Sequence, residues 1–358
     1  MPRLQVNKED VTNSAITRDI MDNNAAMAQA LESVDLSDSR AIQDTILSNS
    51  DYVNTYIGEL FYLFGNPQVR TMYYTNHLRE LKNPLLTYGQ GEIEYFVTNA
   101  GGKNFNEKGD GLLTPTTDDI KNYVYKVNSF RTFETIVYED DLRMAFLTET
   151  GVYSMVTSKM AALYSQIELE EYTKMRDLIS APVIGGTPTE NKISLPYIVY
   201  EYGNSKDLMK KIRAMGMKMQ FPTGYKTFMP KFGTSALQVQ NCVAPGDLMI
   251  LSNPDSIAEV DVDLLASAFH QDKTDWLFKV LTMDSIPAPD KSINTTVTQC
   301  DAILFHRDLF KVRDTKFKTA TFYNADNDSY KIYVHKNTIY ELSPFYPAVA
   351  VCTKKAIE

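Results

Sequence analysis

The sequence predicts an α+β protein, and three observations carry that prediction. Residues 148–180 form one long helical pattern without a break. Ahead of it, two alternating runs at residues 93–97 and 123–127 are typical of paired strands. After it, short apolar runs alternate with amphipathic helical stretches as far as residue 352. No apolar run approaches the roughly 20 residues that a membrane-spanning helix needs, so we expect no membrane contact.

The N-terminal region divides into two parts of different character. Residues 1–35 are polar with one short helix-like stretch, and we expect them to be an arm with little core of its own. In residues 37–64 the apolar side chains recur at spacings of three and four, which predicts an amphipathic helix. The run Ser48-Asn49-Ser50 is a candidate break, so this region forms either one helix or two.

The two alternating runs predict strands that face each other. Ile93, Tyr95 and Val97 alternate with Glu92, Glu94 and Phe96, and the second run has the same period. The segment between them, rich in glycine, asparagine and charge, is too long for a tight turn. It is either a surface loop or the tip of an extended hairpin.

The long helix is unusual for its length. At 1.5 Å per residue it would extend roughly 45 Å, several times the usual helix in a globular protein. Its apolar side chains recur at helical spacing and predict one buried stripe. The stripe consists of Val152, Val156, Met160, Leu163 and Ile167. The charged residues of the same helix, including the cluster Glu168, Glu170 and Glu171, are expected to face solvent.

Beyond the helix, two strand-like runs are each followed by a short helical segment. Residues 248–251 read as a buried strand that stops at Asn253-Pro254, and residues 302–305 read as a second strand before a one-turn helix. The helix after the first strand places its apolar side chains inward, and we expect a core there. The expected core residues are Leu264, Leu265, Phe269 and Trp276. Residues 204–220 predict another helix, whose methionines are explained by core packing.

Composition excludes several functional classes. The net charge of −9 and a pI near 5.1 argue against a protein that wraps nucleic acid in a basic groove. Cys242, Cys300 and Cys352 are odd in number and far apart, so neither a disulfide framework nor a zinc site is indicated and a reducing compartment is the simplest setting. The four histidines are scattered, and no glycine pair continues as a phosphate-binding motif. We therefore expect no catalytic, metal or cofactor site.

Short stretches from about residue 83 onward resemble one family. They are Asn83-Pro84-Leu85, the acidic run 167–178, residues 209–224, residues 260–275, and the strand-and-helix layout of residues 247–314. Together they resemble tailed-phage major capsid proteins of the Hong Kong 97-type fold, and most closely those of small, short-tailed, protein-primed phages (Salasmaviridae). Residues 1–35 match nothing in that family.

The resemblance implies a domain layout and a role in assembly. The layout would be residues 1–82 as N-terminal arm and helices, 83–147 as the E-loop and its strands, 148–180 as the spine helix of the P-domain, 181–323 as the A-domain, and 324–358 as closing strands of the P-domain. Copies of the chain would form hexamers and pentamers of a head shell. The E-loop would contact the next subunit through residues around its tip. These residues are Gly101, Gly102, Lys103, Phe105, Lys108 and Gly111.

The further partners implied are a scaffolding protein, a portal protein, and packaged double-stranded DNA held by weak non-specific contact. The shell would assemble in the host cytoplasm and belong to the virion. We expect its inner face to be near neutral or mildly basic, because a strongly basic wall would hold the DNA too tightly. The candidate cations are Lys8, Arg18, Arg40, Lys159 and Lys174. Two alternatives stay open at this point: an encapsulin-type nanocompartment shell, and a hydrolase that uses the carboxylate clusters.

Overall fold

The computed structural model describes the chain in segments. These are residues 12–63, 74–86, 89, 91–97, 120–148, 150–186, 193–201, 205–222, 225–232, 242–267, 278–289, 297 and 299–354. The chain divides into two compact units. Unit 1 comprises Met1–Thr75, Phe130–Glu171 and Lys316–Asn337, and unit 2 comprises Asn76–Ser129, Tyr172–Thr315 and Thr338–Glu358. No helix among the described residues is both long and apolar enough to cross a membrane.

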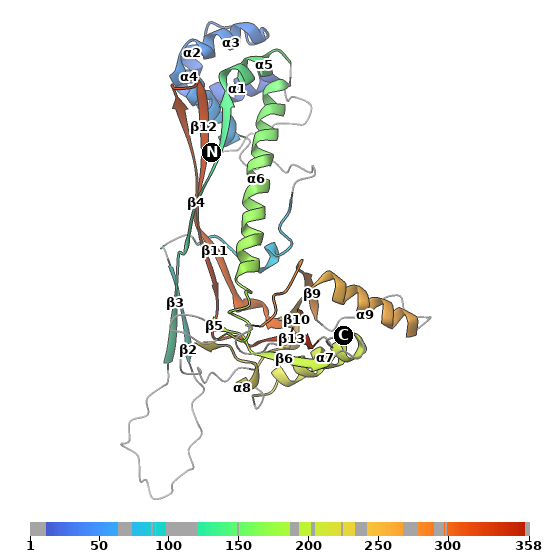
Figure 1. The fold of residues 1–358 in the computed structure, drawn as a ribbon. Helices are drawn as coiled ribbons and strands as arrows, with labels where there is room; N and C mark the ends of the chain where they lie inside the picture. The colour runs from blue at the N-terminus through green and yellow to red at the C-terminus, as the bar shows by residue number, and fades with distance from the viewer. Residues whose placement is uncertain are drawn as a thin grey trace, which may run out of the picture. The chain divides into compact units, whose positions relative to one another are not determined.

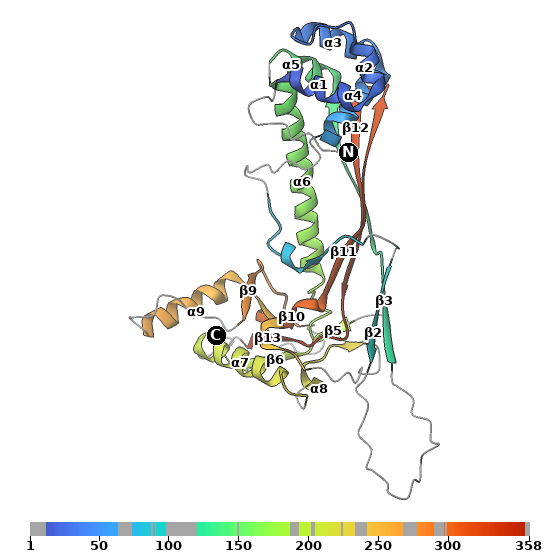
Figure 2. The same ribbon diagram turned by 180° about the vertical axis from the view of Figure 1, so that it is seen from behind.

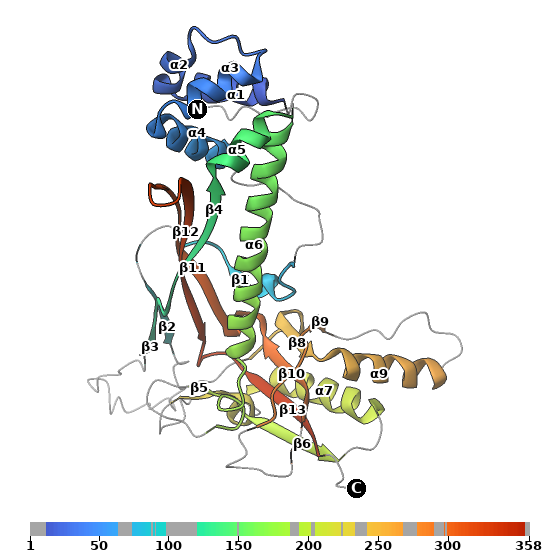
Figure 3. The ribbon, with the colours of Figure 1, turned by 45° about the horizontal axis from the view of Figure 1, so that its top comes forward.

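Unit 1 contains a group of helices around the start of the long helix (Figures 1 and 3). The helices are α1 (Asn13–Asn23), α2 (Ala25–Leu31), α3 (Ser39–Leu47), α4 (Ser50–Leu63), α5 (Glu139–Phe146) and most of α6 (Gly151–Asp177). Of the two alternatives for residues 37–64, the structure shows two helices, because α3 ends at Leu47 and α4 begins at Ser50. The long helix is confirmed, at 27 residues, and its predicted apolar stripe is buried.

The N-terminal helices are part of the core of unit 1. Ile16, Ile20, Met27 and Leu31 are at most 2% exposed and pack in one cluster with residues of α4, α5 and α6. Asn13 adds a polar contact, because its amide donates to the Thr148 carbonyl and accepts from the Val152 amide at the start of α6. The expectation that residues 1–35 have little core of their own is therefore wrong for the described part. Four apolar residues among polar ones are enough when other helices complete the cluster.

A sheet supplies the second layer of unit 1. Its order is β1 (Lys82–Asn83), β11 (Phe310–Asn324), β12 (Ser329–Leu342) and β4 (Ser129–Tyr138), and only the last three contribute residues to unit 1. Phe133 and Val334 pack against Leu163 and Ile167 of α6. Glu171 and Lys336 form a buried ion pair between helix and sheet, with 4% and 3% of their side chains exposed. The expectation that Glu171 faces solvent is therefore wrong. Lys336 on β12 places its ammonium against the Glu171 carboxylate, which allows the carboxylate to be buried.

Unit 2 is built on a five-stranded sheet in the order β6-β13-β10-β8-β9. Its strands are β6 (Tyr197–Glu201), β13 (Ala348–Lys354), β10 (Gln299–His306), β8 (Leu248–Ser252) and β9 (Lys279–Thr282). Side chains alternate between two buried faces: Ala302 and Leu304 pack with α7 (Ser205–Met219), while Ile303 and Phe305 pack with Met175 at the end of α6. Burial on both faces explains the unbroken apolar runs of β8 and β10.

Helices and short elements complete unit 2. α7 and α9 (Pro254–Ser267) cover the same face of the sheet (Figure 2). The predicted strands at residues 248–251 and 302–305 and the helix at 204–220 are confirmed. The remaining elements are β2 (Gly91–Val97), β3 (Ile120–Lys126), β5 (Ile193–Ser194), β7 (Lys231–Phe232), α8 (Tyr225–Phe228), and the 3-10 turns Arg79–Leu81, Pro245–Asp247 and Arg307–Leu309.

Two sequence-based expectations are corrected in unit 2. β13, expected to close the P-domain with β12, instead lies between β6 and β10 of the five-stranded sheet. The second expectation was that the cysteines form no disulfide. In β13, however, Cys352 lies opposite Cys300 on β10, and the two side chains form a disulfide. The two cysteines are separated by 52 positions in the sequence, and the register between such distant strands cannot be predicted from spacing. Cys242 is free and exposed.

Candidate functional site

The β2–β3 hairpin of unit 2 has an inverted pattern of polar and apolar side chains. The register pairs Ile93 with Val124 and Val97 with Ile120, so these residues and Tyr95 share one face. That face is exposed: the five side chains are 44–63% accessible. A two-stranded ribbon on a globular protein normally turns its apolar face inward. Here the apolar face is the one left open.

The opposite face of the hairpin carries the charged side chains and attaches to the rest of unit 2. The Glu94 carboxylate accepts hydrogen bonds from the Tyr125 hydroxyl, from Lys311 Nζ at 2.9 Å and from Ser343 Oγ at 2.8 Å. Glu92 pairs with Arg313 at 3.2 Å. These polar contacts hold the ribbon with its glutamate face toward the rest of unit 2.

A second carboxylate and several aromatic rings extend this attachment. Glu341 accepts from the Tyr123 hydroxyl at 3.2 Å and from the Lys126 amide at 3.3 Å. Phe96 stacks on Phe345 with ring centroids 5.6 Å apart. The base of the hairpin is therefore a defined part of unit 2.

The electrostatics of Glu94 make the attachment sensitive to pH. Burial raises the pKa of Glu94, but the hydrogen bonds from Tyr125, Lys311 and Ser343 together with the Lys311 charge outweigh burial and hold the pKa below its usual value. The same contact and burial raise the pKa of Tyr125, so its hydroxyl stays a donor. The folded state therefore favours ionised Glu94.

We expect Glu94→Gln to lower the free energy of unfolding by about 1.5–3 kcal/mol at pH 7, because hydrogen bonds to a charged group are lost. A carboxyl with a lowered pKa stabilises the fold above its unfolded pKa of about 4.3, and this contribution is lost as pH falls through the folded value. The difference between wild type and Glu94→Gln should therefore shrink below about pH 4. Urea unfolding at pH 7, 5, 4 and 3 measures it. Glu134→Gln on the exposed part of β4 is the control, and a difference that grows on acidification would contradict the prediction.

The structure places only some of the predicted site residues. The spine residues Val152, Val156, Met160, Leu163 and Ile167 are buried along α6. Leu264 and Leu265 lie in α9, whose side chains are not described at those positions. The tip residues Gly101, Gly102, Lys103, Phe105, Lys108 and Gly111, together with Phe269 and Trp276, lie outside the described residues. The role of Glu94 and the exposure of the apolar hairpin face were not predicted from the sequence. Alternation with a period of two predicts that a strand has two different faces, but it does not indicate which face is buried.

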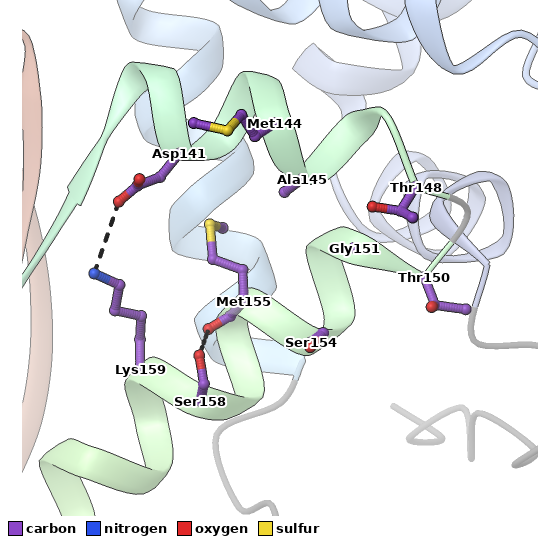
Figure 4. A pocket seen from close by; sticks show the side chains of 10 residues that line it. All are labelled: Asp141, Met144, Ala145, Thr148, Thr150, Gly151, Ser154, Met155, Ser158 and Lys159. Carbon is purple, nitrogen blue, oxygen red and sulfur yellow. Dashed lines mark hydrogen bonds and ion pairs between the residues drawn. The ribbon is translucent and has the colours of Figure 1, made fainter.

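A hollow of about 560 Å³ lies between α5 and the start of α6 in unit 1 (Figure 4). Asp141 and Lys159 on its wall are 3.8 Å apart, and Ser158 donates to the Met155 carbonyl. The rest of the lining is methionine, alanine, glycine and hydroxyl side chains. Within the described segments no group of three or more His, Cys, Asp or Glu residues could hold a metal ion. A single ion pair in an open hollow does not form an acid–base or nucleophilic arrangement.

Comparison with known proteins points to a single family. A family model described as Phi29-like phage major capsid protein matches residues 14–352. The major capsid protein of Bacillus phage PZA is 25% identical over 292 residues, which cover 81% of this chain and 61% of that protein. The major capsid protein of Bacillus phage B103 is 26% identical over 310 residues, covering 86% of this chain and 65% of that protein. The chain thus spans about three fifths of the length of these relatives.

A solved structure shows the same fold. In the capsid of Staphylococcus phage Andhra, a chain with 15% sequence identity aligns with a TM-score of 0.56, covering 81% of this chain and 88% of that one. At this identity the likeness concerns the fold alone. It confirms the predicted α+β, Hong Kong 97-type architecture.

Proposed function

Because the chain belongs to the family of Phi29-like phage major capsid proteins, we propose that it is the subunit from which a phage head shell is built. Copies join as hexamers and pentamers and close around double-stranded DNA. On this proposal the chain is a structural protein rather than an enzyme.

The observation that carries the proposal is the open apolar face of the β2–β3 hairpin. Ile93, Tyr95, Val97, Ile120 and Val124 are exposed, whereas Glu94 of the same ribbon is turned toward Lys311 and Ser343. Contiguous exposed apolar side chains on a folded protein are typical of an interaction surface. The hairpin is the base of the expected E-loop, so the face is proposed to lie against the next subunit.

The other partners follow from the role of a container. A chain of net charge −9 encloses DNA through weak, non-specific contacts and does not grip it. A scaffolding protein would guide the early shell, and a portal protein would occupy one vertex for DNA entry. Assembly would take place in the host cytoplasm. Apart from β13, which lies in the five-stranded sheet, the domain layout stays part of the proposal, with α6 as the spine helix and the core around Leu264, Leu265, Phe269 and Trp276 in the A-domain.

We expect Ile93→Asp with Tyr95→Asp to leave a folded subunit that no longer forms closed shells. The two side chains contribute little to the fold because they are 50% and 63% exposed. At an interface, however, a buried unpaired carboxylate costs several kcal/mol. Negative-stain electron microscopy counts shells, and circular dichroism checks the fold. The matched control is Ile93→Leu with Tyr95→Phe, which keeps the face apolar and should assemble normally. Normal shells from the aspartate variant would show that this face is not an interface.

A further inference from the structure

The sheet of unit 1 has one open face. α6 packs on the other face, where Phe133 and Val334 contact Leu163 and Ile167, and where Phe317 stacks with Tyr164 at 6.5 Å. Since side chains alternate along a strand, Lys316, Lys318 and Phe322 of β11 and Lys331 and His335 of β12 point away from α6. The hydrogen bond between His335 and Thr132 of β4 lies on this same face. In Figures 1 and 2 no described helix of unit 1 covers it.

This open face is basic in an acidic protein. Its three lysines, Lys316, Lys318 and Lys331, define what we call the lysine face. No carboxylate of the described residues forms an ion pair with any of the three. Phe322 and Phe130 on the same side are 60% and 69% exposed. Unpaired cations beside exposed aromatic rings indicate a surface that another molecule covers.

Carboxylates gather at the end of the same sheet, around the β11–β12 turn. Tyr323 donates to Asp328 at 2.7 Å, and the Glu139 amide donates to the Asp328 carbonyl. Beyond burial, the charges of Glu139, Asp328 and Asp51 all raise the pKa of Tyr330. Arg143 pairs with Glu139, which raises the pKa of Arg143, and the charges of Asp140 and Asp44 act in the same direction. The group, which we call the acidic end, comprises Asp44, Asp51, Glu139, Asp140, Asp326 and Asp328.

That Arg18 and Arg40 line the inner face of the shell stays a prediction. Residues 12–63 are nevertheless acidic as a whole. They contain two arginines, Arg18 and Arg40, and eight carboxylates. The carboxylates are Asp19, Asp22, Glu32, Asp35, Asp38, Asp44, Asp51 and Glu59. The folded N-terminal helices are therefore an acidic surface.

We propose that the lysine face of one copy binds the acidic end of a second copy. The inference rests on the proposed self-assembly and adds a pair of surfaces to it. Lys318 is eight residues from Asp326 along an extended strand, which is roughly 25 Å and well beyond the screening length of about 8 Å at physiological salt. Lys316 and Lys318 are therefore not neutralised by the acidic end of their own copy, whereas Lys331, three residues from Asp328, lies nearer to it. Two different surfaces on every copy make a head-to-tail contact, which is the kind that repeats around a ring.

A charge reversal tests the lysine face. We expect Lys316→Glu with Lys318→Glu to raise the protein concentration needed for shell formation by about tenfold or more, because like charges then face each other. The matched control is Lys210→Glu with Lys218→Glu on the exposed side of α7, which makes the same change in net charge. Assembly is followed by light scattering and electron microscopy in DNA-free buffer, with the unfolding midpoint as the check on the fold. If the glutamate pair does not fold, Lys316→Gln with Lys318→Gln replaces it, and the expected rise is smaller but has the same sign.

Reversal of the partner surface completes the test. Asp44→Lys with Asp51→Lys should also block assembly, and the four substitutions in one chain should restore it, since each charged surface again meets its opposite. Assembly of the Lys316→Glu, Lys318→Glu variant at the wild-type concentration would overturn the inference, as would an equal defect in the α7 control. So would a variant that assembles normally but loses DNA binding in a gel-shift titration, because the face would then serve DNA. Failure of the wild-type chain to form shells would instead refute the proposed function.

Discussion

Replacing Lys336 by methionine should lower the free energy of unfolding by about 3–5 kcal/mol, because the buried Glu171 carboxylate loses the ammonium it contacts. The Lys336 and Glu171 side chains are 3% and 4% exposed, so water cannot take the place of the missing ammonium. Replacing both partners by methionine should recover most of that loss, since two apolar side chains of similar volume suit the interior between α6 and β12. Urea unfolding of the single and double variants forms a double-mutant cycle.

An exposed ion pair provides the comparison for this cycle. Lys279 pairs with Glu80, and their side chains are 58% and 48% exposed. Lys279→Met should therefore cost less than about 1 kcal/mol. A loss that is no larger for Lys336→Met than for Lys279→Met would show that Glu171 and Lys336 are solvated in solution.

Truncating Phe305 to alanine should cost about 3–5 kcal/mol of unfolding free energy, because a large ring is removed from a closed core. Phe305 is 0% exposed in the central strand β10, and its ring packs edge-on against Phe310 with centroids 5.2 Å apart. Phe221→Ala, at a position 60% exposed, should change the stability by less than about 0.5 kcal/mol. Denaturant unfolding of the two variants gives the comparison. Equal losses would mean that the five-stranded sheet does not enclose Phe305.

The two kinds of proposed contact surface, apolar and charged, should respond differently to salt during shell assembly. The open hairpin face is apolar, whereas the lysine face and the acidic end are charged, so salt should affect them differently. Raising the salt concentration weakens contacts between exposed charges and leaves apolar burial largely intact. Variants of the two surfaces can therefore be distinguished by the salt dependence of assembly as well as by its extent.

The local elements of this protein follow from the pattern of its residues alone. The period of the apolar residues defined α6 and its buried stripe from Val152 to Ile167, because burying one helical face requires spacings of three and four whatever the partner is. Breaker residues placed the end of β8 at Asn253-Pro254 and the gap between α3 and α4. The alternating runs of β2 and β3 predicted a strand pair, and their register confirms it.

What each face of these elements contacts depends on how distant segments pack together. The hairpin could turn either its glutamates or its apolar residues inward, and the contacts of Glu94 with Lys311 and Ser343 decided it. Glu171 is buried and the cysteines 300 and 352 are paired because strands far away in the sequence lie opposite them. Residues 13–31 gained a core because α4, α5 and α6 supply its other half. Whether a side chain is buried or paired depends on the element that packs against it as well as on its own element. The periodicity of the sequence describes only the side chain's own element.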